Sequence, residues 1–191
     1  IFTRAWDGHG DNLSWSDPAN WSGDTLPNAA DSVYISANQS VTLAAADGTR
    51  SVGSLLVAGE LRLLGTTLLV ANSSQVSGQL VLGARSILDV TGSHTQTSTS
   101  VLRVEVAPDG NHGRIVARQS FRAGGQLVVD VSAILNIWQQ TRFDLVTSAM
   151  IFGSFSAVSL TGSSSLQISL TTRGGVMTLK IQPRASVAKI E

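Results

Sequence analysis

The sequence predicts an all-β fold, a right-handed parallel β-helix with about nineteen to twenty residues per turn. Short apolar segments recur at one pitch, because Val41–Leu43, Leu61–Leu63 and Leu80–Leu82 follow one another at nearly equal intervals. Such periods are typical of solenoids, whose short strands bury their apolar sides only by stacking on neighbouring turns. Glycine and serine corners separate the segments, and the Leu-Arg-Leu order of the second one shows the alternation of a half-buried strand.

Other apolar residues repeat at the same pitch. The pairs that this interval separates are Ile35 with Leu55, Leu68 with Ile87, and Val57 with Val76. The competing architecture is a β-sandwich of short hairpins, which predicts a strand roughly every eight to twelve residues. The apolar segments here come about every six or seven residues, and this closer spacing favours the β-helix.

The composition favours a neutral protein with a sizeable core. Of 191 residues, 42% are hydrophobic and 14% are charged, and 13 Lys and Arg balance 13 Asp and Glu. This balance argues against nucleic acid as a partner and against binding to an anionic membrane surface. No apolar run is long enough for membrane insertion. Because a neutral surface repels copies of itself weakly, we expect self-association. The absence of cysteine excludes disulfides, thiolate zinc sites and cysteine nucleophiles.

Residues 1–32 form a predicted N-terminal cap that is rich in tryptophan and aspartate. It holds Trp6, Trp15 and Trp21, three of the four tryptophans of the chain. The open end of a β-helix exposes strand edges and core, and large rings on an ordered loop would cover it. The alternative is a glycan-binding platform, in which at least two exposed rings stack on sugars.

This opening resembles that of many extracellular β-helix modules, including bacterial surface and autotransporter-like passengers. The residues that carry the resemblance are Trp6-Asp7-Gly8, Trp15, Asp17–Ser22, Leu26-Pro27 and Asp31–Ile35. The entry into the first strands, with Val41, Ser54-Leu55 and Gly59–Leu61, is also similar to the eight-glycine β-domain of some cell-surface hyaluronidases. The resemblance covers about residues 6 to 64. It implies a secreted β-helix that is mostly a non-catalytic part of a larger protein.

Two further kinds of candidate site involve this region. Asp7 and Asp11 flank glycines and could contribute oxygen ligands to calcium, but the acidic residues of a full calcium loop are missing. We therefore expect no cofactor, with calcium as the candidate ion if one binds and a solvated turn as the alternative. Candidate N-glycosylation sites occur at four Asn-X-Ser sequons, which begin at Asn12, Asn20, Asn38 and Asn72. They indicate a secreted glycoprotein, or they arise by chance in a serine-rich chain.

The rest of the chain is divided as follows. Residues 33–141 are expected to form β-helix coils, with Ser93–Ser100 as a polar loop leaving the coil or a mobile flap. Ser132–Gln140, which contains Trp138, is predicted as a short helix or a packed loop. Residues 142–182 are expected to form a C-terminal hairpin cap that turns at Arg173–Gly175, and residues 183–191 a polar tail.

The closing segments also carry a resemblance. Phe143–Val146, Gly153–Phe155 and Gly175–Leu179 resemble the closing module of secreted β-helix surface proteins, in which hairpins fold over the end of the coil. This resemblance implies that both ends of the coil are covered.

Catalytic chemistry is weakly indicated. Asp89 and Asp130 are separated by about two turns of the predicted coil, so a β-helix could place both carboxylates on one face as in a glycoside hydrolase. No Arg, Lys or His falls beside them at the pitch of the coil, and solvated side chains are the simpler interpretation. The chain contains no Gly-X-Ser-X-Gly string and no phosphate-binding glycine loop. We therefore expect no enzyme.

The function that the sequence favours is structural. We expect an extracellular or cell-surface protein, a rigid β-rod that assembles with copies of itself into a filament or matrix. One alternative is an adhesion module that binds carbohydrate through Trp6, Trp15 or Trp21. A less favoured alternative is a β-helix carbohydrate-active enzyme that uses Asp89 and Asp130. Because the chain opens at Ile1 instead of Met, we expect a processed chain or a piece of a longer protein.

Overall fold

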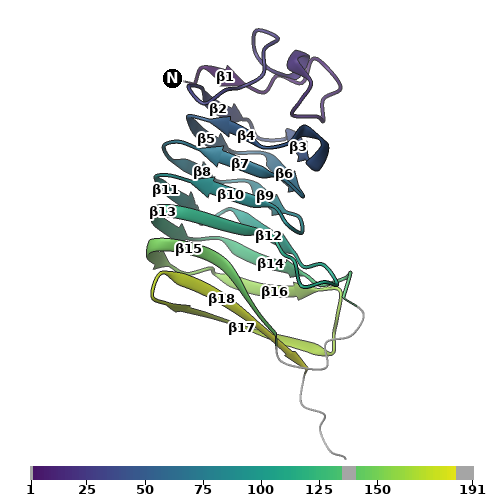
Figure 1. The fold of residues 1–191 in the computed structure, drawn as a ribbon, viewed down its shortest axis with the longest axis vertical. Helices are drawn as coiled ribbons and strands as arrows, with labels where there is room; N and C mark the ends of the chain where they lie inside the picture. Colours follow the sequence, from purple (N-terminus) through teal and green to yellow (C-terminus); the bar gives the residue numbers. More distant parts are fainter. Residues whose placement is uncertain (1, 135–140, 184–191) are drawn as a thin grey trace, which may run out of the picture.

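The computed structural model describes residues 2–134 and 141–183. The described chain is all-β, and most strand pairs are parallel, as the sequence predicts. The strands stack along the long axis of the molecule, with the N-terminal segment at one end and the C-terminal strands at the other (Figure 1). No helix in the described part of the chain is long and apolar enough to cross a membrane.

The parallel strands form three ladders. Ladder 1 contains β1 (Arg4–Ala5), β2 (Ser32–Ile35), β5 (Ser54–Val57), β8 (Ser74–Val76) and β11 (Ser93–Gln96). Ladder 2 contains β4 (Arg50–Val52), β7 (Thr67–Val70) and β10 (Ile87–Val90). Ladder 3 contains β3 (Ser40–Ala44), β6 (Glu60–Leu64), β9 (Gln79–Leu82), β12 (Val101–Glu105), β14 (Gln126–Asp130) and β16 (Ala157–Thr161). Short 3-10 turns are η1 (Pro18–Asn20) and η2 (Ala45–Asp47).

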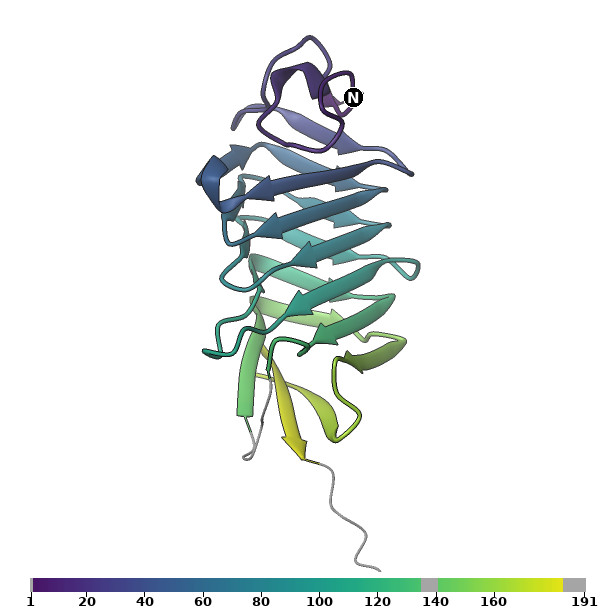
Figure 2. The ribbon, with the colours of Figure 1, turned by 90° about the vertical axis from the view of Figure 1, so that its right-hand side faces the viewer.

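Two long strands connect ladders 1 and 2. The first half of β13 (Arg114–Ala123) pairs with β10 and its second half pairs with β11. β15 (Thr141–Gly153) pairs with both halves of β13. The chain therefore passes through ladders 1, 3 and 2 in a repeating order, and we call one such pass a coil (Figure 2).

The register confirms part of the predicted repeat. Val41 pairs with Leu61 and Leu61 with Leu80, and Val57 pairs with Val76. All five side chains are fully buried. Ladder 3 therefore keeps the predicted pitch over its first three strands.

Two predicted columns are wrong. Leu55 pairs with Val33 and not with Ile35, because the first coil is longer than the predicted pitch. Leu68 pairs with Leu88 and not with Ile87. Because side chains alternate between the two faces of a strand, this one-residue difference puts Leu88 in the core and leaves Ile87 half-buried.

The polar stretch Ser93–Ser100 is also not a loop that leaves the coil. Its first four residues are β11, and the side chains of His94 and Gln96 are buried inside the stack. They are accommodated because Ser74, one strand away in ladder 1, hydrogen-bonds to the His94 ring.

The pitch lengthens toward the C-terminus. Successive partners of Leu80 in ladder 3 are Leu102, Leu127 and Val158, and each interval is longer than the one before it. Parallel pairing continues to Thr161, beyond the expected boundary at residue 142.

The last two strands form the predicted hairpin. β17 (Leu166–Arg173) and β18 (Val176–Pro183) are antiparallel around Gly174 and Gly175, and β18 pairs with β15. Residues 135–140 of the predicted short helix, Trp138 among them, lie outside the described residues, as do residues 184–191 of the predicted tail.

Glycines at the corner between ladders 1 and 3 let the coils approach. A Cβ at Gly59 would lie 2.3 Å from the carbonyl oxygen of Ser36, and a Cβ at Gly78 would lie 2.1 Å from that of Gly59. Neither distance is compatible with a side chain, so the backbone itself forms the contact between coils.

We predict that Gly78→Ala lowers the free energy of unfolding by about 1–3 kcal/mol, because the added methyl group forces the coils apart. Urea unfolding followed by tryptophan fluorescence measures the loss. Ser77→Ala is the control, because Ser77 is half-buried and its hydroxyl donates one long hydrogen bond, of 3.4 Å, to the carbonyl of Val57. Equal losses in the two variants would show that the corner does not require glycine.

Candidate functional site

The three N-terminal tryptophans are buried. Trp6 is 4% exposed, and Trp15 and Trp21 are not exposed at all. The ring of Trp21 contacts both others edge-on, at centroid distances of 5.0 Å to Trp6 and 4.7 Å to Trp15. A sugar platform requires exposed ring faces, and the faces of these three rings are buried in this structure.

These tryptophans instead attach the N-terminal segment to the first strands. The backbone N–H of Trp6 donates to the carbonyl of Tyr34 in β2 at 2.9 Å, and that of Trp15 donates to Thr42 in β3 at 2.8 Å. The indole N–H of Trp21 donates to the Trp15 carbonyl at 2.8 Å. The segment therefore covers the N-terminal edges of ladders 1 and 3.

Asn20 organises the same segment from the inside. Its side-chain oxygen accepts from the backbone N–H groups of Gly10 and Asn12, at 3.0 and 2.9 Å. Its amide donates to Asp11 at 2.7 Å and to the carbonyl of Ser14 at 3.0 Å. Asn20 is fully buried, and a glycan on its amide nitrogen would remove at least one of the two hydrogen bonds that this nitrogen donates. The other three sequon asparagines, Asn12, Asn38 and Asn72, are exposed.

The two candidate calcium ligands, Asp7 and Asp11, interact with groups of their own loop. One oxygen of Asp11 accepts from the N–H groups of Ser14 and Leu13 at 2.8 and 2.9 Å, and also from Asn20. The hydrogen bonds from Ser14, Asn20 and Leu13 hold the pKa of Asp11 below its usual value. An oxygen of Asp7 lies 3.6 Å from the ring of His9. Among the described residues, no group of three or more His, Asp or Glu side chains is arranged to hold a metal ion.

Asp89 and Asp130 lie in different ladders, Asp89 on β10 and Asp130 on β14. The coils of this region are longer than the predicted pitch, so two turns of that pitch do not return to the same face. Each carboxylate also has an arginine partner that the predicted pitch missed. Asp89 pairs with Arg118 at 2.9 Å, and Asp130 pairs with Arg103.

The environment of Asp130 keeps it ionised. Burial opposes ionisation, but hydrogen bonds from the side chain and backbone of Ser132 and from Arg103 outweigh it, so the pKa of Asp130 lies below its usual value. A general acid in glycoside hydrolysis needs a raised pKa. The structure therefore gives neither carboxylate the arrangement of a glycosidase pair.

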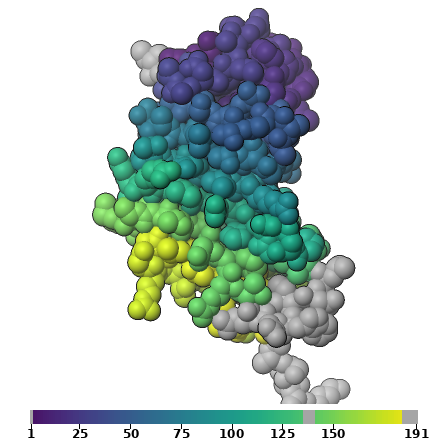
Figure 3. Space-filling model, in the orientation of Figure 1, coloured from purple at the N-terminus to yellow at the C-terminus, as the bar shows by residue number. Residues whose placement is uncertain are grey.

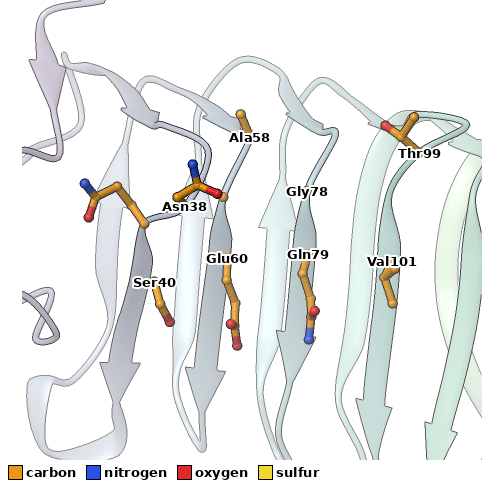
Figure 4. A pocket seen from close by; sticks show the side chains of 10 residues that line it. Asn38, Ser40, Ala58, Glu60, Gly78, Gln79, Thr99 and Val101 are labelled. Carbon is orange, nitrogen blue, oxygen red and sulfur yellow. The ribbon is translucent and has the colours of Figure 1, made fainter.

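A groove runs along the corner between ladders 1 and 3. It encloses about 400 Å³ and is lined by Asn38, Gln39, Ser40, Ala58, Gly59, Glu60, Gly78, Gln79, Thr99 and Val101. Ser40, Glu60 and Gln79 are in register on neighbouring strands, and their side chains lie side by side along it (Figure 4). Glu60 is its only carboxylate and is paired with Arg62 at 2.9 Å. The groove offers a row of hydrogen-bonding groups and no acid–base pair.

A buried polar cluster lies between β8 and β11. The hydroxyl oxygen of Ser74 is 2.6 Å from Nδ1 of His94, and Nε2 of Gln96 is 3.0 Å from Nε2 of the same ring. The ring stacks on Phe121, with centroids 5.5 Å apart. Because burial disfavours the imidazolium, the pKa of His94 falls to about 3. The cluster resembles a nucleophile with its base, but all three side chains are 3% exposed or less, so no substrate reaches it.

Comparison with protein-family models finds no match to the chain, and a search of curated protein sequences finds no relative.

We predict an acid-dependent loss of stability that originates at His94. The unfolded chain takes up a proton near pH 6.5, whereas the folded His94 does so only near pH 3. Stability is therefore fully present above pH 6.5 and falls by about 1.4 kcal/mol per pH unit below it. Urea unfolding at pH 6.5 and 5.0 should differ by about 2 kcal/mol. His94→Gln should remove this difference, and His9→Gln, whose ring is 79% exposed, should keep it. An unchanged slope in His94→Gln would contradict the assignment.

We further predict that Asn20→Asp lowers the free energy of unfolding by about 3 kcal/mol or more. The new carboxylate would face the Asp11 carboxylate and the Ser14 carbonyl, where the amide now donates. Near-ultraviolet circular dichroism and urea unfolding report the loss through the adjacent tryptophans. Asn72→Asp is the matched control because Asn72 is exposed. Similar losses in both variants would assign the effect to charge alone.

Proposed function

We propose that this chain is an extracellular structural or surface protein, a rigid β-rod that associates end to end with copies of itself. In this proposal the three ladders are the faces of a right-handed parallel β-helix. The support is the repeating order of strands through ladders 1, 3 and 2 and the parallel pairing between successive coils. Such a stack is stiff because every coil is hydrogen-bonded to its neighbours.

The observation that carries the proposal is the state of the core at the C-terminal end. One inward column of ladder 3 runs through Val41, Leu61, Leu80, Leu102, Leu127 and Val158. Its first five members are at most 1% exposed, but Val158 is 37% exposed. Within the described residues, β16 pairs only with β14, so its outer edge has no strand partner. A further coil would both pair with this edge and cover Val158.

Among the described residues, most exposed large hydrophobic side chains other than Leu69 belong to the N-terminal segment or to the last coils. Met150 and Phe152 are 54% and 51% exposed on β15, and Phe2 and Leu13 are 46% and 54% exposed in the N-terminal segment. These segments lie at opposite ends of the molecule (Figure 3). Contact between unlike ends repeats without closure and produces filaments. A chain with no net charge opposes such contact weakly.

The extracellular part of the proposal has separate support. Asn12, Asn38 and Asn72 are exposed, which is required for glycosylation in a secretory pathway. The resemblance of the opening to extracellular modules points the same way.

The corner groove supports glycan binding as a second candidate. Its row of Ser40, Glu60 and Gln79 can donate and accept hydrogen bonds along an extended chain. This candidate uses no tryptophan. Glu60→Ala should weaken any oligosaccharide affinity in a calorimetric titration, whereas Asp89→Ala should leave it unchanged. We do not extend the proposal to catalysis, because Asp89 and Asp130 are paired with arginines.

Electron microscopy of negatively stained protein with light scattering tests the main proposal. We expect filaments or large regular assemblies, and Val158→Lys or Met150→Lys should shift the population toward the 20.0 kDa monomer. Leu69→Lys is the control, since Leu69 is 39% exposed but lies in the middle of ladder 2. A clean monomer in the unmodified protein, or equal effects of all three variants, would contradict end-to-end association.

A further inference from the structure

A cluster with an excess of positive charge lies on the outer face of ladder 2 near the C-terminal end. A hollow of about 490 Å³ is lined by His112, Arg114, Arg142, Asp144 and Thr178. These residues come from the turn before β13 and from β13, β15 and β18, which lie side by side (Figure 1). Its position is remote from the corner groove and independent of the open edge of β16.

The arginines of this hollow differ from most others in the described chain. Arg4, Arg62, Arg85, Arg103 and Arg118 each have a carboxylate partner. Arg114 and Arg142 have none among the described residues. The comparison is closest on β13 itself, where Arg118 is held 2.9 Å from Asp89. Two free guanidinium groups facing one hollow are unusual in a chain whose positive and negative side chains balance.

The neighbouring strand adds to this excess of positive charge. Arg142 pairs in register with Lys180 on β18, and Lys180 likewise has no carboxylate partner in the described residues. Like charges directly opposite each other on antiparallel strands repel and destabilise the pair. The one carboxylate of the hollow, Asp144, accepts a hydrogen bond from the hydroxyl of Thr178 at 2.7 Å. The two arginines of the hollow, with Lys180 opposite one of them, therefore outnumber its one carboxylate.

His112 is held at the rim of the same hollow. Its Nδ1 is 3.3 Å from the carbonyl oxygen of Gly110 and its Nε2 is 3.2 Å from that of Asp144. The ring also contacts Phe143 edge-on, with centroids 5.2 Å apart. These contacts fix the wall of the hollow next to Arg114.

We propose that this hollow, which we call the oxyanion site, binds a sulfate group through Arg114 and Arg142. A guanidinium presents paired N–H donors that match the oxygens of such groups. A negatively charged ligand would also relieve the repulsion between Arg142 and Lys180. The volume of the hollow is sufficient for a charged group together with the sugar unit that carries it. The source of the oxyanion is either an acidic polysaccharide or a free inorganic ion.

Calorimetric titration at low ionic strength tests the proposal, with dextran sulfate, sodium sulfate and neutral dextran as probes. We expect dextran sulfate or sodium sulfate to bind and neutral dextran not to bind. Binding of sodium sulfate alone would assign the site to free oxyanions, and tighter binding of dextran sulfate would assign it to the polymer. Arg114→Gln combined with Arg142→Gln should weaken the affinity about tenfold or more.

The matched control is Arg122→Gln. Arg122 lies on the same strand, is exposed and has no carboxylate partner in the described residues, but it belongs to the half of β13 in ladder 1. Its affinity should stay within about twofold of the unmodified protein. Lys180→Gln gives an independent readout, because it should weaken binding and raise the thermal midpoint of the ligand-free protein. No binding of either anion, or an equal effect of Arg122→Gln and the double variant, would overturn the site.

Discussion

Close backbone contact between successive coils is the constraint on which the rest of this structure depends. Neighbouring hydrogen-bonded strands lie about 4.8 Å apart. The coils must keep this spacing at the corners as well as within the ladders. At the corner between ladders 1 and 3 it is kept because Gly59 and Gly78 have no Cβ. The same approach places Ser40, Glu60 and Gln79 next to one another and so produces the corner groove.

Stacking buries the inward side chains only where a coil lies on both sides, so the two ends present a separate problem. At the N-terminal end, β1 pairs with β2, and Ser14 makes a bridge to Thr42 of β3. Behind these contacts Trp15 and Trp21 are completely buried. At the C-terminal end the hairpin closes ladder 2 by pairing β18 with β15, whereas ladder 3 ends at β16. The stack of coils therefore has a direction, and its two ends are chemically different surfaces.

The sequence predicts the fold correctly where the alternation of apolar residues is regular and the length of the coil is nearly constant. In ladder 3 the segments that begin at Val41, Leu61 and Leu80 alternate strictly and repeat at nearly constant length, and their register was correct. The hairpin turn at Gly174 and Gly175 was also predictable, because two glycines between apolar strands indicate a reversal.

The errors of register have one cause, which is that the length of a corner cannot be read from the apolar residues. The longer first coil moves Leu55 out of register with Ile35. The longer coils after β10 place Arg118 beside Asp89 and Arg103 beside Asp130, at separations of 29 and 27 residues. A search at the predicted pitch misses both pairs. Asp89 and Asp130, the candidate pair that rests on that pitch, are therefore not brought together on one ladder.

The burial of Asn20 and of the three tryptophans could not be predicted from the sequence, for a different reason. Whether a polar loop places its tryptophans inside or outside depends on what satisfies its backbone. Here the side chain of Asn20 does so, because it bonds with Gly10, Asn12, Asp11 and Ser14 at once. Nothing in the order of residues distinguishes this asparagine from the exposed Asn12 or Asn38.

The buried cluster of Ser74, His94 and Gln96 has a structural role that apolar residues would not provide. Columns of leucine and valine pack almost equally well when one strand slides by two residues, since the same face remains inward. The bond between Ser74 and His94 forms in one alignment of β8 and β11 only, and a slip would leave both groups buried without partners. His94 is also stacked on Phe121 of the next coil. The polar stretch that reads as a loop therefore fixes the register of three successive coils, at the point where the pitch begins to lengthen.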